Sequence, residues 1–119
     1  MQALTHLFRE GYIGTLKLKN RVVMGAIGMR LPVHIIDGEL NPLIIDFHVA
    51  RAKSGVGLIL MSNTCIDPLG KNQPDSLLTS DPDFVPLIKK LVDAVHRHGA
   101  KIGLHLQHSG ALARSENIG

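Results

Sequence analysis

The chain has 119 residues, 45% of which are apolar, with a formal net charge of +3. This length allows one small domain and no more, and the apolar share excludes a disordered chain. The densest basic group, Lys17, Lys19 and Arg21, has no aromatic residues interleaved with it, so we expect a solvated hairpin and no nucleic-acid partner.

The first half of the chain predicts a hairpin, two strands and a helix. The stretch YIGTLKLKNR alternates apolar and polar residues around a Gly-Thr turn, and residues 21–27 form an apolar run typical of a buried strand. A loop follows over 28–40, with a turn signal at Asp37-Gly38. Asn41 is a suitable cap for a helix over 42–53 that Gly55 ends, and the run 56–63 predicts the second strand.

The second half predicts a long loop, a helix and a third strand. Residues 64–80 are polar and contain several turn residues, and Asp83 is the expected cap of the next helix. One face of that helix is expected to carry Val85, Ile88, Val92 and Val95, and the opposite side Lys89, Lys90, Asp93 and Arg97. Gly99 ends the helix, and residues 101–107 form the third strand.

The order strand, helix, strand, helix, strand predicts an α/β fold with a parallel sheet and right-handed connections. In such folds the loops at the carboxyl ends of the strands build the site. On the third strand, Ile102, Leu104 and Leu106 share one face, expected to pack against helices. Gly103, His105 and Gln107 share the other face, which suits the mouth of a barrel.

Three segments carry a resemblance to a known family. These are LFREGYIGTLKLKNRVVMGAI, ARAKSGVGLILMSNT and LVDAVHRHGAKIGLHLQHSG. They resemble the opening third of the Old Yellow Enzyme, or NADH:flavin oxidoreductase, family, in its 2,4-dienoyl-CoA reductase-like branch. The resemblance covers essentially the whole chain.

The resemblance implies a fold and a domain organisation. Residues 1–119 would be the FMN-binding amino-terminal part of a (β/α)₈ TIM barrel, with about three parallel strands, two helices and the hairpin. A complete barrel needs about 250 residues, so we expect a fragment, a split subunit or a truncated product. The expected partners are the rest of the barrel or a complementary chain, and a homo-oligomer is possible.

The resemblance also implies a chemistry. The family transfers hydride from NAD(P)H through FMN to an activated alkene, here an enoate or dienoyl-CoA type substrate. An iron–sulfur cluster and FAD are expected only in a longer parent protein. The alternative is a non-catalytic fragment or split subunit that assembles through its open sheet edges.

By the same resemblance, five residues are candidates for binding the flavin. Ala26, Ile27 and Gly28 follow the first strand, where small residues let a flat ring approach the backbone. Asn63 ends the second strand, and His105 stands where the family normally has a glutamine that bonds the flavin pyrimidine. The alternatives are a glycine-containing strand end without a ligand, a turn residue at Asn63 and a structural histidine at His105.

The remaining polar residues suggest no catalytic centre and no metal site. His108 matches a family histidine that we interpret as organising a loop, and Ala111 replaces the arginine that often follows it. His34 is expected to be an exposed loop residue. The only tyrosine, Tyr12, lies in the opening hairpin, far from any substrate. We therefore name no catalytic residue.

The cellular location is predicted from what the sequence lacks. Cys65 is the only cysteine, so an intramolecular disulfide is excluded, which fits a reducing cytoplasm. No apolar run reaches about 18 residues, and the amino terminus lacks a signal-peptide pattern. We expect a cytoplasmic protein that does not span a membrane.

Overall fold

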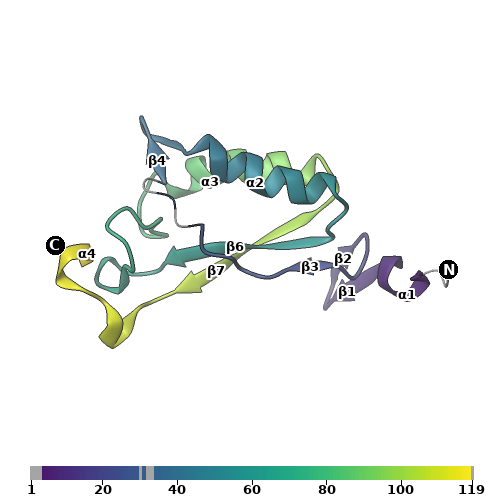
Figure 1. Cartoon of the computed structure of the whole chain (residues 1–119), viewed down its shortest axis with the longest axis horizontal. Coiled ribbons are helices and arrows are strands. Elements are labelled where there is room, and N and C mark those ends of the chain that lie inside the picture. The colour runs from purple at the N-terminus through teal and green to yellow at the C-terminus, as the bar shows by residue number, and fades with distance from the viewer. Residues whose placement is uncertain (1–3, 30, 32–33, 119) are drawn as a thin grey trace.

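The structure, a computed structural model, describes residues 4–29, 31 and 34–118. Its regular elements are short near the amino terminus and long in the middle of the chain (Figure 1). In chain order they are α1 (Thr5–Phe8), β1 (Gly11–Ile13), β2 (Leu16–Leu18), β3 (Val23–Met24), β4 (Ile35–Ile36), β5 (Glu39–Leu40), α2 (Pro42–Lys53), β6 (Leu58–Cys65), the 3₁₀ turn η1 (Pro68–Gly70), α3 (Phe84–His96), β7 (Lys101–Gln107), the 3₁₀ turn η2 (Gly110–Leu112) and α4 (Ser115–Ile118).

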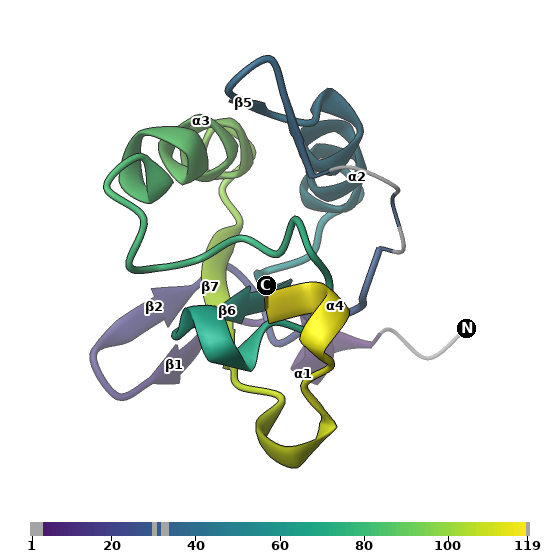
Figure 2. The same ribbon diagram turned by 90° about the vertical axis from the view of Figure 1, so that its left-hand side faces the viewer.

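A parallel sheet of order β3-β6-β7 organises the fold. Val23 pairs with Leu58, and Leu58 pairs with Lys101, all in the parallel sense. Helices α2 and α3 lie together on one side of the sheet, and its other side is open in the described chain (Figures 1 and 2). The predicted parallel α/β order is confirmed, and the carboxyl ends of the strands point to one end of the molecule.

Several predicted boundaries are confirmed. Helix α2 spans 42–53 as predicted, the Asn41 side chain accepts a hydrogen bond from the Leu43 amide at 3.0 Å, and Gly55 has a φ of +105°. Strand β7 matches the predicted 101–107. The opening hairpin is present as β1 and β2, paired antiparallel around Gly14.

The first predicted strand is much shorter than expected. Only Val23 and Met24 are in β3, and residues 25–28 are exposed and irregular. The prediction took the apolar run for a strand buried on both faces, but Val23 is 47% exposed because one side of the sheet is open. The second strand runs 58–65 instead of 56–63. The loop over 28–40 contains the hairpin β4–β5, turned by Asp37 (φ 52°) and Gly38 (φ 78°).

The prediction for α3 needs two corrections. The Asp83 side chain makes no capping hydrogen bond; the carboxylate of Asp81 instead accepts the Asp83 amide at 2.9 Å. Val85 is 67% exposed, so the predicted apolar face is displaced. The buried stripe is wider and centres on Leu91, while the predicted polar side is exposed. Its buried residues are Phe84, Leu87, Ile88, Leu91, Ala94 and Val95.

The core lies between the two helices and the helix-facing side of β6. Ile59, Met61, Leu91 and Val95 are at most 2% exposed, and Ile44 of α2 completes the cluster. Burying an aliphatic side chain of this size contributes about 1.5–3 kcal/mol. The packing of these residues therefore holds β6 against both helices.

The aliphatic face of β7 is only partly covered, contrary to the prediction. Ile102 packs against the core, but Leu104 is 39% and Leu106 58% exposed. Strand β7 is an edge strand of the described sheet, and no described helix covers its second half. Two apolar side chains, Leu104 and Leu106, are therefore exposed beside the strand end.

Asn20 fixes the start of β3 against the turn that precedes β6. Its side chain is 7% exposed, donates to the Gly55 carbonyl at 2.7 Å and accepts the Val22 amide at 3.1 Å. Gly57 lies so close that a Cβ built on it would come within 2.8 Å of the Asn20 carbonyl oxygen. This contact requires glycine at position 57.

We predict that Gly57→Ala lowers the free energy of unfolding by about 1–3 kcal/mol, because the added methyl group meets backbone that cannot yield easily. Gly25→Ala is the matched control, since nothing lies within 4 Å of a Cβ at that position. Urea unfolding followed by circular dichroism measures both. Equal stability of the two variants would contradict the proposed contact.

Candidate functional site

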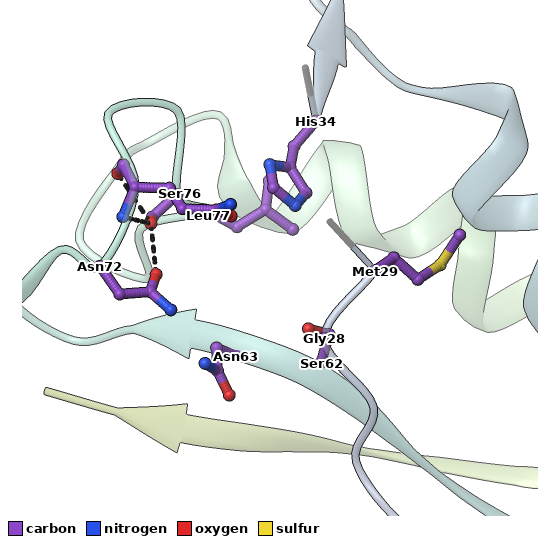
Figure 3. Close-up of a pocket in the computed structure, with 9 residues that line it drawn as sticks. Gly28, Met29, His34, Ser62, Asn63, Asn72, Ser76 and Leu77 are labelled. Carbon is purple, nitrogen blue, oxygen red and sulfur yellow. Dashed lines mark hydrogen bonds between the residues drawn. The ribbon is translucent and has the colours of Figure 1, made fainter. Parts of the chain in front are cut away.

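A cavity of about 440 Å³ lies at the carboxyl ends of β3 and β6 (Figure 3). Three segments form it: the residues after β3, the end of β6 and the loop that follows η1. Its wall is polar, with amide and hydroxyl side chains on the β6 side. The lining residues are Gly28, Met29, His34, Ser62, Asn63, Asn72, Gln73, Ser76 and Leu77.

A register shift in the β6–β7 pair places two of the predicted residues side by side. Leu60 pairs with Gly103, but the next pair is Asn63 with His105, so β6 advances three residues while β7 advances two. A bulge of this kind re-aims the side chains that follow it. His105 Nδ1 lies 2.9 Å from Asn63 Oδ1, so the imidazole N–H donates to the amide carbonyl.

The structure brings some of the predicted site residues together and leaves others apart. Gly28 and Asn63 line the cavity, and His105 joins them through Asn63. His105 is exposed, on the face of β7 opposite to that of Ile102, and is not beneath a helix. Ala26 and Ile27 lie on the exposed segment leading to Gly28, with Ile27 54% exposed, and are not among the lining residues.

His34 is half-buried in the structure, where the sequence predicted an exposed loop residue. Its Nδ1 lies 2.9 Å and its backbone amide 2.6 Å from the same carboxylate oxygen of Asp75. The two side chains are 13% and 30% exposed. These residues are 41 positions apart, so no local sequence pattern could indicate the pair.

The loop beyond η1 is stiffened by a serine. Ser76 Oγ accepts the Gln73 amide at 3.1 Å and lies 2.9 Å from both Asn72 Oδ1 and the Gln73 carbonyl (Figure 3). The serine has one proton to share between these two acceptors. This network holds one wall of the cavity.

The residues after β7 hold a loop in place, which is the role expected for His108 from the sequence. The Gly110 amide donates to His108 Nδ1 at 2.9 Å, and the His108 ring packs against Gly70. Gln107 Nε2 donates to Ser109 Oγ at 2.7 Å and to the Gly70 carbonyl at 3.2 Å. These contacts tie the end of β7 to η1 and are not part of the cavity wall.

A second histidine, His48, is buried behind the cavity. It is 1% exposed, its Nδ1 donates to the Ile44 carbonyl at 2.7 Å, and it shares a narrow recess with His34 and Met61. Burial lowers the pKa of His48, the bond to Ile44 opposes this, and the charge of Arg51 lowers it further. Taken together, these effects lower the pKa of His48 and favour its neutral form.

A match to a family of known sequences shows which family the chain belongs to. The profile of the NADH:flavin oxidoreductase / NADH oxidase family matches residues 6–118. The chain belongs to this family. Two similar proteins are an NADH oxidase from Thermoanaerobacter brockii and an NADPH dehydrogenase from Listeria monocytogenes. The first is 40% identical over 111 residues and the second 36% over 110 residues.

Solved structures of reductases show the same fold over the part that this chain covers. Morphinone reductase superposes with a TM-score of 0.75 at 26% identity, over 90% of this chain and 28% of that enzyme. 2-Naphthoyl-CoA reductase gives a TM-score of 0.78 at 25% identity, over 92% of this chain and 16% of that enzyme. The described chain is thus a partial (β/α)₈ barrel, as predicted.

The chain spans only a part of its relatives. It covers 17% of the Thermoanaerobacter protein and 32% of the Listeria protein, while 92% of the chain is matched in both cases. Within the described residues, no helix has the length and apolarity needed to cross a membrane.

We predict that the buried His48 makes the fold acid-sensitive. Its pKa is lowered in the folded state, so the unfolded state binds more protons, and stability falls as the pH drops below about 6.5. Urea midpoints between pH 7 and pH 5 measure this effect.

His48→Leu removes the titrating group and should show a flatter pH profile, so the variant gains stability relative to the wild type as the pH falls. Both proteins contain Arg51 and His34, the ionisable residues nearest to position 48 that are named above. Parallel profiles for the two proteins would rule out His48 as the source.

Proposed function

We propose that this chain supplies the first part of the FMN site of an NAD(P)H-dependent oxidoreductase, and that His105 and Asn63 bond the flavin pyrimidine. The observation that carries the proposal is the His105–Asn63 pair. Bound FMN would take hydride from NAD(P)H and pass it to an acceptor, while the protein holds and orients the ring.

The free atoms of this pair fit the edge of a flavin pyrimidine. His105 Nδ1–H donates to Asn63 Oδ1, which leaves the Asn63 NH₂ group as a donor and His105 Nε2 as an acceptor. A pyrimidine edge offers carbonyl acceptors beside an N–H donor. The pair can therefore replace the glutamine amide expected at position 105 from the family resemblance.

The segment after β3 has the open backbone that a flat ring requires. Nothing lies within 4 Å of a Cβ built on Gly25 or Gly28, and Ala26 between them is small and exposed. Side chains at these positions would limit the approach of a planar ligand. This openness supports Ala26, Ile27 and Gly28 as ring contacts.

The family and its members support the wider reaction. The relatives are named NADH oxidase and NADPH dehydrogenase, and the structural neighbours are reductases of small molecules. We propose that the whole protein reduces an activated alkene of the enoate or dienoyl-CoA type. The proton-donating groups of the family are expected from later strands, so activity would need the rest of the barrel.

We predict that His105→Ala weakens FMN binding about tenfold, because one hydrogen bond to the ring and the orientation of Asn63 are lost together. His105→Gln should bind FMN at least as well as the wild type, since its amide offers a coplanar donor and acceptor. Quenching of FMN fluorescence on titration with the full chain measures both.

His96→Ala, on the exposed face of α3, is the matched control and should leave FMN binding unchanged. A wild-type chain that binds no FMN, even when assembled with the remaining barrel, would refute the proposed function. Equal affinity of His105→Ala and wild type would refute only the role of His105.

A second role, assembly with a complementary chain or with the rest of the barrel, is favoured by the open sheet. Strands β3 and β7 each pair only with β6 among the described strands. Val23, Leu104 and Leu106 are 39–58% exposed on these two strands. Open edges with apolar side chains associate readily unless they are covered.

We predict that the purified chain self-associates as its concentration rises, and that Leu104→Thr/Leu106→Thr weakens this association at least severalfold, because apolar surface is removed from the uncovered face. Sedimentation velocity at increasing concentration measures the effect. Val85→Thr, which removes an exposed apolar side chain on α3, is the control. A monomeric wild type at all concentrations would contradict the prediction.

A further inference from the structure

Residues 71–76, which we call the wall segment, supply Asn72, Gln73 and Ser76 to the lining of the cavity (Figure 3). Asn72 and Gln73 also line a second cavity of about 540 Å³. None of the residues 71–76 is buried, whereas Leu77, which follows them, is 4% exposed. Apolar packing therefore does not fix the wall segment, and its position depends on how its two ends are held.

Strand β6 holds the end of the wall segment at Leu77. The Cys65 amide donates to the Leu77 carbonyl at 2.8 Å, and the Thr79 amide donates to the Cys65 carbonyl at 2.9 Å. Cys65 is the last residue of β6 and is 0% exposed. This end is therefore fixed to the sheet.

The residues after β7 hold the other end of the wall segment at Gly70. The Gly70 carbonyl accepts the Ser109 amide at 2.9 Å and Gln107 Nε2 at 3.2 Å. The His108 ring lies against the same glycine, and a Cβ built on Gly70 would come within 2.6 Å of His108 Cγ. The Gly110 amide fixes the ring in turn by donating to Nδ1 at 2.9 Å. We call the contacts of Gly70 with Gln107, His108 and Ser109 the Gly70 clamp.

The Gln107 side chain joins the clamp at a cost. Its Oε1 is the only buried side-chain nitrogen or oxygen without a hydrogen-bond partner in the described part of the chain. Both hydrogens of its Nε2 are used, one by the Gly70 carbonyl and one by Ser109 Oγ. A buried acceptor without a partner is unfavourable, and turning the amide over would set two oxygens against each other at Gly70. The donation to Gly70 therefore dictates how this side chain lies.

We propose that the Gly70 clamp positions the wall segment, and that Gln107 and His108 thereby act as positioning residues for the molecule bound in the cavity. Neither they nor Gly70 belong to the cavity lining. Gly70 and Gln107 are 37 positions apart, so the clamp also joins the loop after β6 to the end of β7.

Opening the clamp would leave the wall segment held at Leu77 and by hydrogen bonds of single side chains. Asn117 Nδ2 donates to the Asn72 carbonyl at 3.0 Å, and Asp75 accepts the His34 amide at 2.6 Å. We expect a wider and more mobile cavity wall as a result. An effect on flavin binding rests on the proposed function, which places FMN in this same cavity.

The first test needs no flavin and no substrate. Hydrogen exchange of backbone amides in the full chain, followed by NMR, reports how often each hydrogen bond opens. Two amides report on the wall segment: that of His34, which donates to Asp75, and that of Gln73. The amides of Cys65 and Thr79 report on the end fixed to the sheet.

His108→Ala should speed exchange of the two wall amides about fivefold or more and leave the two reference amides at wild-type rates, because only one end is released. Gln107→Glu should do the same, since it keeps the size of the side chain but has no N–H to give to Gly70. His96→Ala, which removes an exposed histidine on α3, is the matched control. Equal acceleration at all four amides, or none at the wall, would overturn the proposal.

The double variant His108→Ala/Gln107→Glu tests whether the contacts form one clamp. Because both residues act on Gly70, we expect the wall amides to speed up by less than the product of the two separate effects. Separate effects that simply multiply would show two independent contacts and contradict a single clamp.

The second test measures FMN binding by the chain assembled with the remaining barrel. His108→Ala should weaken binding about three- to tenfold, mainly through faster dissociation, because the wall no longer holds its place. Wild-type affinity in this variant would overturn the positioning role and leave the proposed function standing. If the wild type binds no FMN, the proposed function fails, while amide exchange still decides whether the clamp positions the wall segment.

Discussion

The parallel pairing of β6 with a strand on each side is the constraint on which the rest of this structure depends. Parallel neighbours require the chain to return over the sheet between them, which α2 and α3 do on one side. Because the three strands run in the same direction, their carboxyl ends all point toward one end of the molecule, where β6 and β7 end (Figure 1). The cavity, the His105–Asn63 pair and the His34–Asp75 pair all lie at this end.

The polar pairs are built from segments that are far apart in the sequence. Asn63 and His105 are 42 residues apart, and His34 and Asp75 are 41 apart. In each pair the oxygen partner can only accept, so Nδ1 carries the hydrogen. The other ring nitrogen, Nε2, is then left without a hydrogen when the ring is neutral. In its neutral form each ring thereby offers Nε2 as an acceptor, His34 in the cavity wall and His105 beside Asn63.

The sequence predicted the bounds of α2 and β7 well. Helix α2 has a cap, a proline at its first position and a glycine after its end, and β7 is bounded by Gly99 and a polar end. The strand β3 was overestimated because an apolar run does not reveal that one face of a sheet is open. The buried face of α3 was predicted at the wrong angle, because Val85 and Val92 fit a helical spacing as well as the buried residues do.

Only part of the candidate site could be predicted from the sequence. Gly28 follows β3, while Asn63 and His105 lie near the carboxyl ends of β6 and β7, the end of a parallel sheet where sites are built. The register shift between Leu60 and Asn63 has no local signal, so the direct contact of Asn63 with His105 was not foreseen. The partnership of His34 with Asp75 depends on two loops meeting in space, which neither loop encodes by itself.

The extra residue in β6 has a consequence for how this segment tolerates change in length. Upstream of it, odd-numbered Ile59 and Met61 face the helices; downstream, even-numbered Thr64 is fully buried while Asn63 lies beside His105. Deleting Ser62 would restore uninterrupted alternation, with Met61 opposite Leu104 and Asn63 still opposite His105, whereas deleting Met61 would also remove a core side chain. Loss of the extra residue at position 62 would thus remove one hydroxyl from the cavity wall while keeping both the core and the pairing of Asn63 with His105.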